Sequence, residues 1–268
     1  MQQIPAAFSG DIPVYYDSYL GPMFFEPFAR NMAERISQLS PSTILELASG
    51  TGRLTKLLPE VVAKGASIIA SDINPAMIQY GRQKTSDTAI EWMEIDAVTL
   101  PFRDHTFDCV VVQFGVMFYS DRVQAFKEAW RVLKPGGHFL FSCWDTLPNN
   151  PVPTIVNDVL HRFFPIDTPA FYTVPFSYHD ESLIKSDLSK AGFNNITIDL
   201  LNLTGYSESA ANAAKGAILG TPTITAIDQR DEEASFQVLK KVEEQITEQF
   251  GSSDIQVPLQ ARVVTCKK

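Results

Sequence analysis

The chain lacks most features of a secreted, membrane-spanning or metal-binding protein. Its three cysteines, Cys109, Cys143 and Cys266, are widely spaced and form neither a disulfide framework nor a metal-ligand motif, so we expect buried apolar thiols and no metal site. The longest apolar stretch, around 107–119, is short and interrupted by polar residues, which argues against a membrane span. The first residues lack the basic and apolar segments of a signal peptide. We therefore expect a cytoplasmic protein.

Basic side chains are also scarce. The chain has 22 lysines and arginines against 31 aspartates and glutamates, which gives a formal net charge of −9. A surface with this excess of negative charge repels a polyphosphate backbone. Nucleic acid is therefore disfavoured as a partner, and a small molecule is the expected substrate.

No repeat or low-complexity tract is present, and short apolar runs alternate with helical patterns instead. Helices are predicted at 53–64, 75–84 and 121–133. The apolar runs are nearly continuous, which is typical of strands in a sheet that is covered on both faces. Strand–helix alternation with short connections predicts an α/β doubly wound sheet with parallel pairing. The predicted strands are 43–48, 67–72, 90–95, 107–113 and 138–143.

The composition changes after Cys143. Residues 145–180 contain six prolines and six aromatic residues, and the N-terminal segment up to Leu39 is also rich in aromatic residues. We interpret the former as a substrate lid and the latter as a cap. The remaining predicted elements are helices at 180–191, 207–218 and 231–250 and strands at 195–203 and 257–266. The apolar face predicted for the long helix consists of Phe236, Leu239, Val242, Ile246 and Phe250.

A glycine-rich turn follows the first predicted strand. It reads Glu46-Leu-Ala-Ser-Gly50-Thr-Gly52, and glycines in such a turn let the backbone approach a ligand without an intervening Cβ. Asp72 ends the second strand, where a carboxylate can accept hydrogen bonds from both hydroxyls of a ribose. Together these features indicate a cofactor that contains a nucleoside.

The charge of the turn discriminates between cofactors. The third glycine of a dinucleotide motif is replaced by Thr55, and a carboxylate at Glu46 would repel a pyrophosphate. The same carboxylate would favour a positively charged amino acid moiety. This favours S-adenosylmethionine over NAD. Asp96, after the third strand, would accept a hydrogen bond from the adenine amine at the same edge of the sheet.

Four segments resemble successive motifs of class I S-adenosylmethionine-dependent methyltransferases. They are ILELASGTGRLT, SDINPAMI, EIDAVTLPFRDHTFD and RVLKPGGHFLFSCWD, and they span about 43–145. The segment YYDSYLGPMFFEPFA resembles the entry segment of the single-domain ubiquinone/menaquinone-biosynthesis-like (type 11) branch. The combination is specific for fold and cofactor and says little about the substrate.

The resemblance implies a Rossmann-like sheet of seven strands with the last antiparallel, which agrees with the seven strands counted above. It also implies the binding of S-adenosylmethionine, with S-adenosylhomocysteine as the product. Ala48 departs from the pattern, because many members have glycine there. The cofactor-binding residues implied position by position are Tyr16, Glu46, Ala48, Gly50, Gly52, Asp72, Ile73, Met77, Asp96, Ala97, Gln113, Phe114 and Gly115.

Methyl transfer from a sulfonium is an in-line displacement, and a base is needed only if the acceptor must lose a proton. The sequence contains no obvious base. For the histidines we prefer a surface or packing role, and His105 and His138 are interpreted as structural. The candidate bases are Tyr15, Tyr19, Tyr119, His161 and His179.

One domain is expected over 1–268. Its parts are a cap (1–40), a cofactor-binding core (41–145), lid and insertion helices (146–180 and 205–250) and a last strand (256–266). The expected activity is methyl transfer to a small, largely apolar organic molecule. Three alternatives stay open: a non-catalytic cofactor-binding relative, an NAD-dependent oxidoreductase, and methyl transfer to protein or RNA. The sequence gives no oligomeric state.

Overall fold

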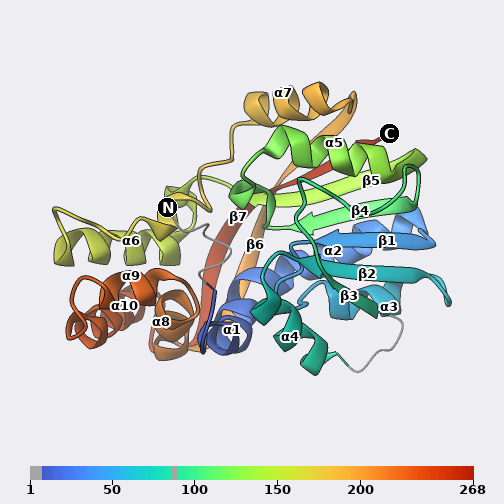
Figure 1. The fold of residues 1–268 in the computed structure, drawn as a ribbon. Helices are drawn as coiled ribbons and strands as arrows, with labels where there is room; N and C mark the ends of the chain where they lie inside the picture. Colours follow the sequence, from blue (N-terminus) through green and yellow to red (C-terminus); the bar gives the residue numbers. More distant parts are fainter. Residues whose placement is uncertain (1–7, 86–89) are drawn as a thin grey trace. The chain divides into compact units, whose positions relative to one another are not determined.

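A computed structural model describes residues 8–85 and 90–268 (Figure 1). The chain divides into two compact units. The first, here called the sheet unit, comprises 28–144, 178–201 and 261–268. The second, here called the helical unit, comprises the chain up to Pro27 together with 145–177 and 202–260. Each unit is described separately below.

The seven strands form one sheet in the order β3-β2-β1-β4-β5-β7-β6. Neighbouring strands from β3 to β5 pair in parallel, and β7 pairs antiparallel with β5. The expected seven-stranded fold with an antiparallel last strand is therefore confirmed. The strands are β1 Thr43–Leu47, β2 Ser67–Asp72, β3 Ile90–Glu94, β4 Phe107–Gln113, β5 Leu133–Trp144, β6 Asn195–Ser209 and β7 Ser253–Lys267.

Three helices of the sheet unit, α4, α5 and α7, begin at side chains that cap their free N–H groups. The Asn74 side chain accepts hydrogen bonds from the first turn of α4, whose first residue is Pro75, and Asp121 and Asp180 cap α5 and α7 in the same way. Gly192 ends α7 with φ +106°. The elements are α2 Glu26–Leu39, the 3-10 turns η3 Thr55–Leu57 and η4 Val116–Phe118, α3 Leu58–Val61, α4 Pro75–Lys84, α5 Arg122–Val132 and α7 Glu181–Ala191.

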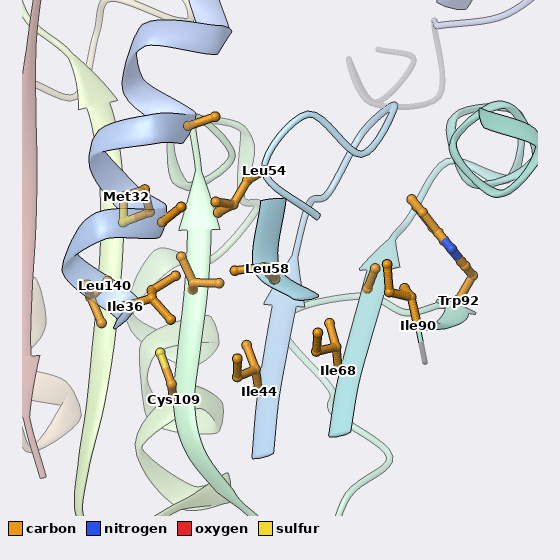
Figure 2. Packing of buried hydrophobic residues seen from close by; sticks show 14 of the residues in the cluster. Met32, Ile36, Ile44, Leu54, Leu58, Ile68, Ile90, Trp92, Cys109 and Leu140 are labelled. Carbon is orange, nitrogen blue, oxygen red and sulfur yellow. The ribbon is translucent and has the colours of Figure 1, made fainter. Parts of the chain in front are cut away.

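Both faces of the sheet are covered by helices. Phe139 and Phe141 of β5 pack against Phe126 of α5, with ring centroids 5.5 Å from it in each case. Leu140, between them in sequence, points to the opposite face and joins a buried cluster with Met32 and Ile36 of α2 (Figure 2). This alternation is the period-2 pattern of a strand buried on both sides.

The helical unit contains a ten-residue π-helix, η2 Tyr16–Phe25. Three glycines let other elements approach its backbone. A Cβ on Gly205 would lie 2.1 Å from the Met23 carbonyl oxygen, one on Gly216 would lie 2.9 Å from the Leu20 nitrogen, and one on Gly220 would lie 2.9 Å from the Tyr16 nitrogen. The other elements are α1 Ile12–Tyr15, η5 Leu147–Asn149, α6 Pro151–Phe163, η6 Phe171–Thr173, α8 Ala210–Leu219, α9 Thr223–Asp228 and α10 Ala234–Phe250.

Three local predictions are corrected by the structure. The helix expected at 53–64 is a turn followed by η3 and the four-residue α3. The strand expected at 138–143 begins earlier, at Leu133, as β5. Phe236 was expected on the buried face of α10 but is 73% exposed. Val242 and Ile246, which were predicted for this face, are buried, and Ala234 and Val238 are the other buried side chains of the helix at four-residue intervals.

Candidate functional site

The candidate site lies in the sheet unit, where four adjacent parallel strands end at one edge. Glu46 lies within β1, Asp72 ends β2, Asp96 follows β3 and Gln113 ends β4. Because these strands are neighbours in the order β3-β2-β1-β4, their carboxyl ends meet along this edge. Open α/β sheets bind their ligands at this edge.

Glu46 is a buried carboxyl group, with 1% of its surface exposed. The Thr55 hydroxyl donates a 2.7 Å hydrogen bond to its Oε2 atom, and the Ser71 hydroxyl donates a 2.9 Å bond to its main-chain carbonyl. Burial raises the pKa of Glu46 to about 8; the Thr55 hydrogen bond lowers this pKa, and the negative charge of Asp72 raises it. The free site therefore holds Glu46 partly protonated near neutral pH.

Asp72 ties the glycine-rich turn to the end of β2. Its Oδ2 atom accepts a 2.8 Å hydrogen bond from the Gly50 N–H, and its Oδ1 atom accepts a 2.9 Å bond from the Asn74 N–H. Burial raises the pKa of Asp72 in spite of these bonds. Each carboxylate oxygen has two acceptor positions, so this carboxylate can also accept ribose hydroxyls.

The turn after β1 has a left-handed backbone at three positions. The φ angles are +52° at Ala48, +56° at Gly50 and +81° at Gly52. A Cβ on Gly52 would lie 2.8 Å from the ring of Trp92, so packing within the protein, and not only ligand access, requires glycine there. Ala48 is a non-glycine residue in a conformation that costs about 1–2 kcal/mol, and such strain is concentrated at functional sites.

The turns after β1 and β4 touch each other. A Cβ on Gly115 would lie 2.5 Å from the Ala48 Cβ, so only glycine lets the second turn approach the first this closely. Phe114 has a φ of +54°, and its ring stacks on Trp144 with a centroid distance of 3.9 Å. Phe28 meets this pair edge-on. The Phe114 ring therefore belongs to an aromatic cluster, and the predicted contact of 113–115 with the methionine end of a cofactor stays a prediction.

The turn after β3 carries the residues predicted to face adenine. Asp96 is exposed, and its Oδ1 atom accepts a 3.1 Å hydrogen bond from the Val98 N–H; Ala97 is 7% exposed. Ile73 is half-buried, and Met77 is 4% exposed in the first turn of α4. These side chains follow β2 and β3, which are neighbouring strands.

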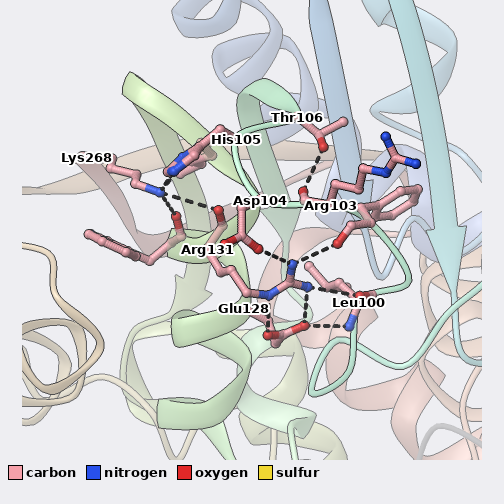
Figure 3. A network of polar contacts seen from close by, with 11 residues as sticks. Leu100, Arg103, Asp104, His105, Thr106, Glu128, Arg131 and Lys268 are labelled. Atoms are coloured by element: carbon pink, nitrogen blue, oxygen red, sulfur yellow. Dashed lines mark hydrogen bonds and ion pairs between the residues drawn. The ribbon is translucent and has the colours of Figure 1, made fainter.

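The sequence reasoning missed Arg131 of α5, which holds the connection between β3 and β4 (Figure 3). Its guanidinium donates hydrogen bonds of 3.0 Å to the Leu100 carbonyl and 2.7 Å to the Phe102 carbonyl, and it pairs with Asp104 at 2.8 Å. Glu128 pairs with the same guanidinium and accepts a 2.8 Å bond from the Leu100 N–H. The motif RVLKPGG contains this arginine, but neither its spacing nor its composition indicates these partners.

Five predicted residues are distributed between the two units. Tyr16 stacks on Phe25 with centroids 5.0 Å apart, Tyr15 stacks on Tyr19 at 6.1 Å, and Nδ1 of the exposed His161 lies 3.0 Å from the Thr168 hydroxyl. All of these belong to the helical unit, so a role of Tyr16 over the cofactor stays a prediction. The half-buried His179 belongs to the sheet unit.

The histidines interpreted as structural have protein partners or charged neighbours. His105 is exposed with a φ of +58°, and its Nδ1 atom lies 3.1 Å from the Leu133 carbonyl oxygen. Burial and the nearby Lys267 lower the pKa of His138. The three cysteines are buried, as expected.

The structure places the carboxyl groups of Glu46, Asp72 and Asp96 along one edge of the sheet. Their predicted pairing with an ammonium group, ribose hydroxyls and an adenine amine stays a prediction. In addition, the buried hydroxyl oxygens of Ser49 and Tyr119 have no hydrogen-bond partner within 8–85 and 90–268. Buried polar groups are normally paired, so these two hydroxyls are suited to a ligand with polar groups.

The described part of the chain contains neither a metal-binding cluster nor a membrane-spanning helix. Among these residues, no group of three or more His, Cys, Asp or Glu side chains is arranged to hold a metal ion. Within the same ranges, no helix has the length and apolar character that crossing a membrane requires.

Comparison with known proteins identifies the family. The family model described as the ubiE/COQ5 methyltransferase family matches residues 25–150. A ubiquinone/menaquinone biosynthesis C-methyltransferase of Escherichia coli is 31% identical over 179 residues, which cover 60% of this chain and 69% of that protein. The protein of the same name from Hahella chejuensis is 38% identical over 122 residues, 44% of this chain and about half (49%) of that protein.

A solved structure confirms the fold. Phosphoethanolamine N-methyltransferase 2 of Haemonchus contortus, in complex with phosphomonomethylethanolamine and S-adenosylhomocysteine, matches with a TM-score of 0.59 and 16% identity. The match covers 96% of this chain and 56% of that one. The cofactor inferred from the charge of the glycine-rich turn is thus the cofactor of the family. The chain belongs to the ubiE/COQ5 methyltransferase family of S-adenosylmethionine-dependent enzymes.

Proposed function

We propose that the chain transfers a methyl group from S-adenosylmethionine to a small, largely apolar organic molecule. The observation that carries this proposal is an aromatic cluster in the helical unit. Tyr16 lies between Phe25 and Phe8, with centroid distances of 5.0 Å and 5.8 Å, and Phe8 lies 6.1 Å from Phe171. Aromatic side chains with few polar groups among them suit an apolar ligand.

The names of the relatives and the net charge of the chain also support a small, largely apolar acceptor. The names of the Escherichia coli and Hahella chejuensis relatives place them in ubiquinone and menaquinone biosynthesis. The net charge of −9 opposes binding to RNA. The solved structure from Haemonchus contortus has the same fold and contains a bound phosphorylated amine. A substrate test must therefore include a polar amine for comparison.

In the sheet unit, each acidic residue has a distinct task in this proposal. Glu46 as a carboxylate would pair with the ammonium group of the cofactor, Asp72 would accept the ribose hydroxyls, and Asp96 would accept the adenine amine. S-adenosylmethionine supplies a methyl group already activated by the positive charge of its sulfur. The protein then has to fix the ligand in line with the acceptor and exclude water.

A base is required only for an acceptor that must lose a proton. The candidates Tyr15, Tyr19, His161 and His179 stay proposals for that task. Tyr119 is poorly suited to it, because burial and the charges of Asp72 and Asp96 raise the pKa of its phenol and keep it protonated. The second candidate function is cofactor binding without catalysis, because binding and methyl transfer use the same residues around the cofactor.

The test is a transfer assay that uses methyl-labelled S-adenosylmethionine with three acceptors: an apolar hydroxylated aromatic ring, phosphoethanolamine and an unstructured RNA. We expect label only in the aromatic acceptor, and Asp72→Ala should abolish the transfer. Labelling of phosphoethanolamine or RNA instead would contradict the proposed substrate class. If the protein binds the cofactor and labels none of the three, a broader panel of apolar acceptors decides between another acceptor and the non-catalytic role.

A further inference from the structure

We propose that Tyr119 is a cofactor-binding residue whose hydroxyl donates a hydrogen bond to the adenosine part of S-adenosylmethionine. This inference rests on S-adenosylmethionine being the cofactor. It assigns Tyr119 a role in binding rather than in proton transfer. Tyr119 and the residues around it that are named below all belong to the sheet unit.

The turn that carries Tyr119 has a fixed position in the sheet unit. Gly115 lies against Ala48, so the turn after β4 is fixed beside the glycine-rich turn after β1. From there η4 forms one 3-10 turn, in which the Phe118 N–H bonds to the Gly115 carbonyl and the Tyr119 N–H bonds to the Val116 carbonyl. Tyr119 is therefore held four residues from this contact, at the edge where the strands end.

The Tyr119 hydroxyl oxygen is buried and has no hydrogen-bond partner in the described ranges. A buried hydroxyl without a partner costs about 1–3 kcal/mol. A ligand that offers an acceptor to this hydroxyl recovers that cost when it binds.

The surroundings of Tyr119 identify the part of the ligand. Burial and, in addition, the negative charges of Asp72 and Asp96 raise the pKa of the Tyr119 phenol. These carboxylates already accept backbone N–H groups from Gly50, Asn74 and Val98. They also flank the place expected for ribose and adenine, both of which offer oxygen or nitrogen acceptors. A protonated phenol beside them is a donor for that part of the ligand.

The experiment compares Tyr119→Phe with wild type by calorimetric titration of S-adenosylhomocysteine and 5′-methylthioadenosine. The latter has the adenosine part but lacks the amino acid. We expect both ligands to bind about 5- to 20-fold more weakly to the variant. Because the substitution removes a hydroxyl without a partner, the free variant should melt at the same temperature or higher. A merely structural role predicts the reverse, with a lower melting temperature and unchanged binding.

Tyr178→Phe is the matched control. The Tyr178 hydroxyl donates a 3.1 Å hydrogen bond to Asp187, so its loss should lower stability and leave the affinity for both ligands unchanged. Equal affinities of wild type and Tyr119→Phe for 5′-methylthioadenosine would overturn the inference. If wild type itself binds neither ligand, the cofactor assignment fails first, and that result is distinguishable from failure of the Tyr119 inference alone.

Discussion

The Thr55 hydroxyl donates a 2.7 Å hydrogen bond to the carboxyl group of Glu46, at the position where a dinucleotide-binding turn would have its third glycine. This contact fixes a buried acid at the start of the glycine-rich turn. It also lowers the pKa of Glu46, which burial raises to about 8. The affinity for a positively charged ligand group must therefore depend on the protonation of Glu46.

Cofactor binding should strengthen as the pH rises towards 8. The pKa of Glu46 lies above its ordinary value of 4.5, so the free protein prefers the protonated acid, whereas the ammonium group of the ligand prefers the carboxylate. We expect the affinity for S-adenosylhomocysteine to rise by up to about tenfold per pH unit between pH 6 and 8 and then level off. The contribution of Glu46 to the stability of the free protein has the opposite sign: it is fully present below 4.5 and is lost as the pH rises through 8.

Calorimetric titrations at several pH values measure this dependence. Glu46→Gln, which resembles the protonated acid, is the control: it should bind weakly throughout and remove the part of the pH dependence that belongs to Glu46. The protonation of the ligand also changes with pH, but this change affects both proteins equally and cancels in the comparison. An identical pH dependence in the variant would exclude Glu46 as the titrating group.

Removal of the Thr55 hydroxyl should weaken binding through Glu46. Thr55→Val keeps the shape of the side chain but leaves the buried acid without this donor, at a cost of about 1–3 kcal/mol in the free energy of unfolding. The pKa of Glu46 should rise, so the pH at which binding levels off should shift upward. Thr55→Ser keeps a hydroxyl and should stay close to wild type in both urea unfolding and calorimetry. Equal behaviour of Thr55→Val and wild type would show that the bond has no effect.

Gly115 and Ala48 should be energetically coupled. Gly115→Ala places a Cβ 2.5 Å from the Ala48 Cβ and 2.9 Å from Val112, and we expect a loss of about 1–3 kcal/mol in the free energy of unfolding. Ala48→Gly alone should be close to neutral, because relief of the left-handed strain is offset by greater backbone entropy of the unfolded chain. In the double variant, Ala48→Gly should recover part of the loss. Strict additivity in a double-mutant cycle would contradict the contact.

Arg131 should keep the turn after β3 in place for the adenine. Arg131→Lys retains the charge but not the planar set of donors that reaches Leu100, Phe102 and Asp104. We expect faster hydrogen–deuterium exchange across 96–106 and a several-fold weaker affinity for 5′-methylthioadenosine. Arg35→Lys, at a surface pair with Asp199, is the control. Unchanged exchange in 96–106 would show that the network does not hold this segment.

Gly216 tests the packing of the π-helix in the helical unit. Intrinsic helix propensity alone predicts that Gly216→Ala in α8 stabilises the chain by about 1 kcal/mol. The added Cβ, however, would lie 2.9–3.0 Å from atoms of Leu20 and Tyr19, so we expect destabilisation. Thermal unfolding decides the sign. A higher melting temperature for Gly216→Ala would show that α8 does not need this close approach.

Much of the fold could be predicted because its signals are local. The apolar runs at 67–72 and 107–113 and the helical pattern at 75–84 place β2, β4 and α4 at the predicted residues. Phe236 shows where a local pattern fails, since Ala234 and Val238 rather than this larger side chain face the interior. The π-helix at Tyr16–Phe25 was not predicted, and its backbone is approached closely by Gly205, Gly216 and Gly220, which lie far along the chain.

Some features of the candidate site could be predicted from local signals in the sequence, and others could not. Glu46 and Asp72 follow from strand ends and charge, and the structure places them on adjacent strands. The left-handed backbone at Ala48 and Phe114 could not be predicted, because it follows from how the turns after β1 and β4 meet. The bonds made by Arg131 join residues about 30 positions apart, which no local pattern reveals.

The central claim is that the glycine-rich turn with Glu46 and Asp72 binds S-adenosylmethionine rather than a dinucleotide. Calorimetric titration of the purified protein with S-adenosylmethionine and, separately, with NAD tests it most directly. The account predicts saturable one-site binding of S-adenosylmethionine, loss of that binding in Asp72→Ala, and no heat of binding with NAD. Binding of NAD, or S-adenosylmethionine binding that Asp72→Ala leaves unchanged, would contradict it.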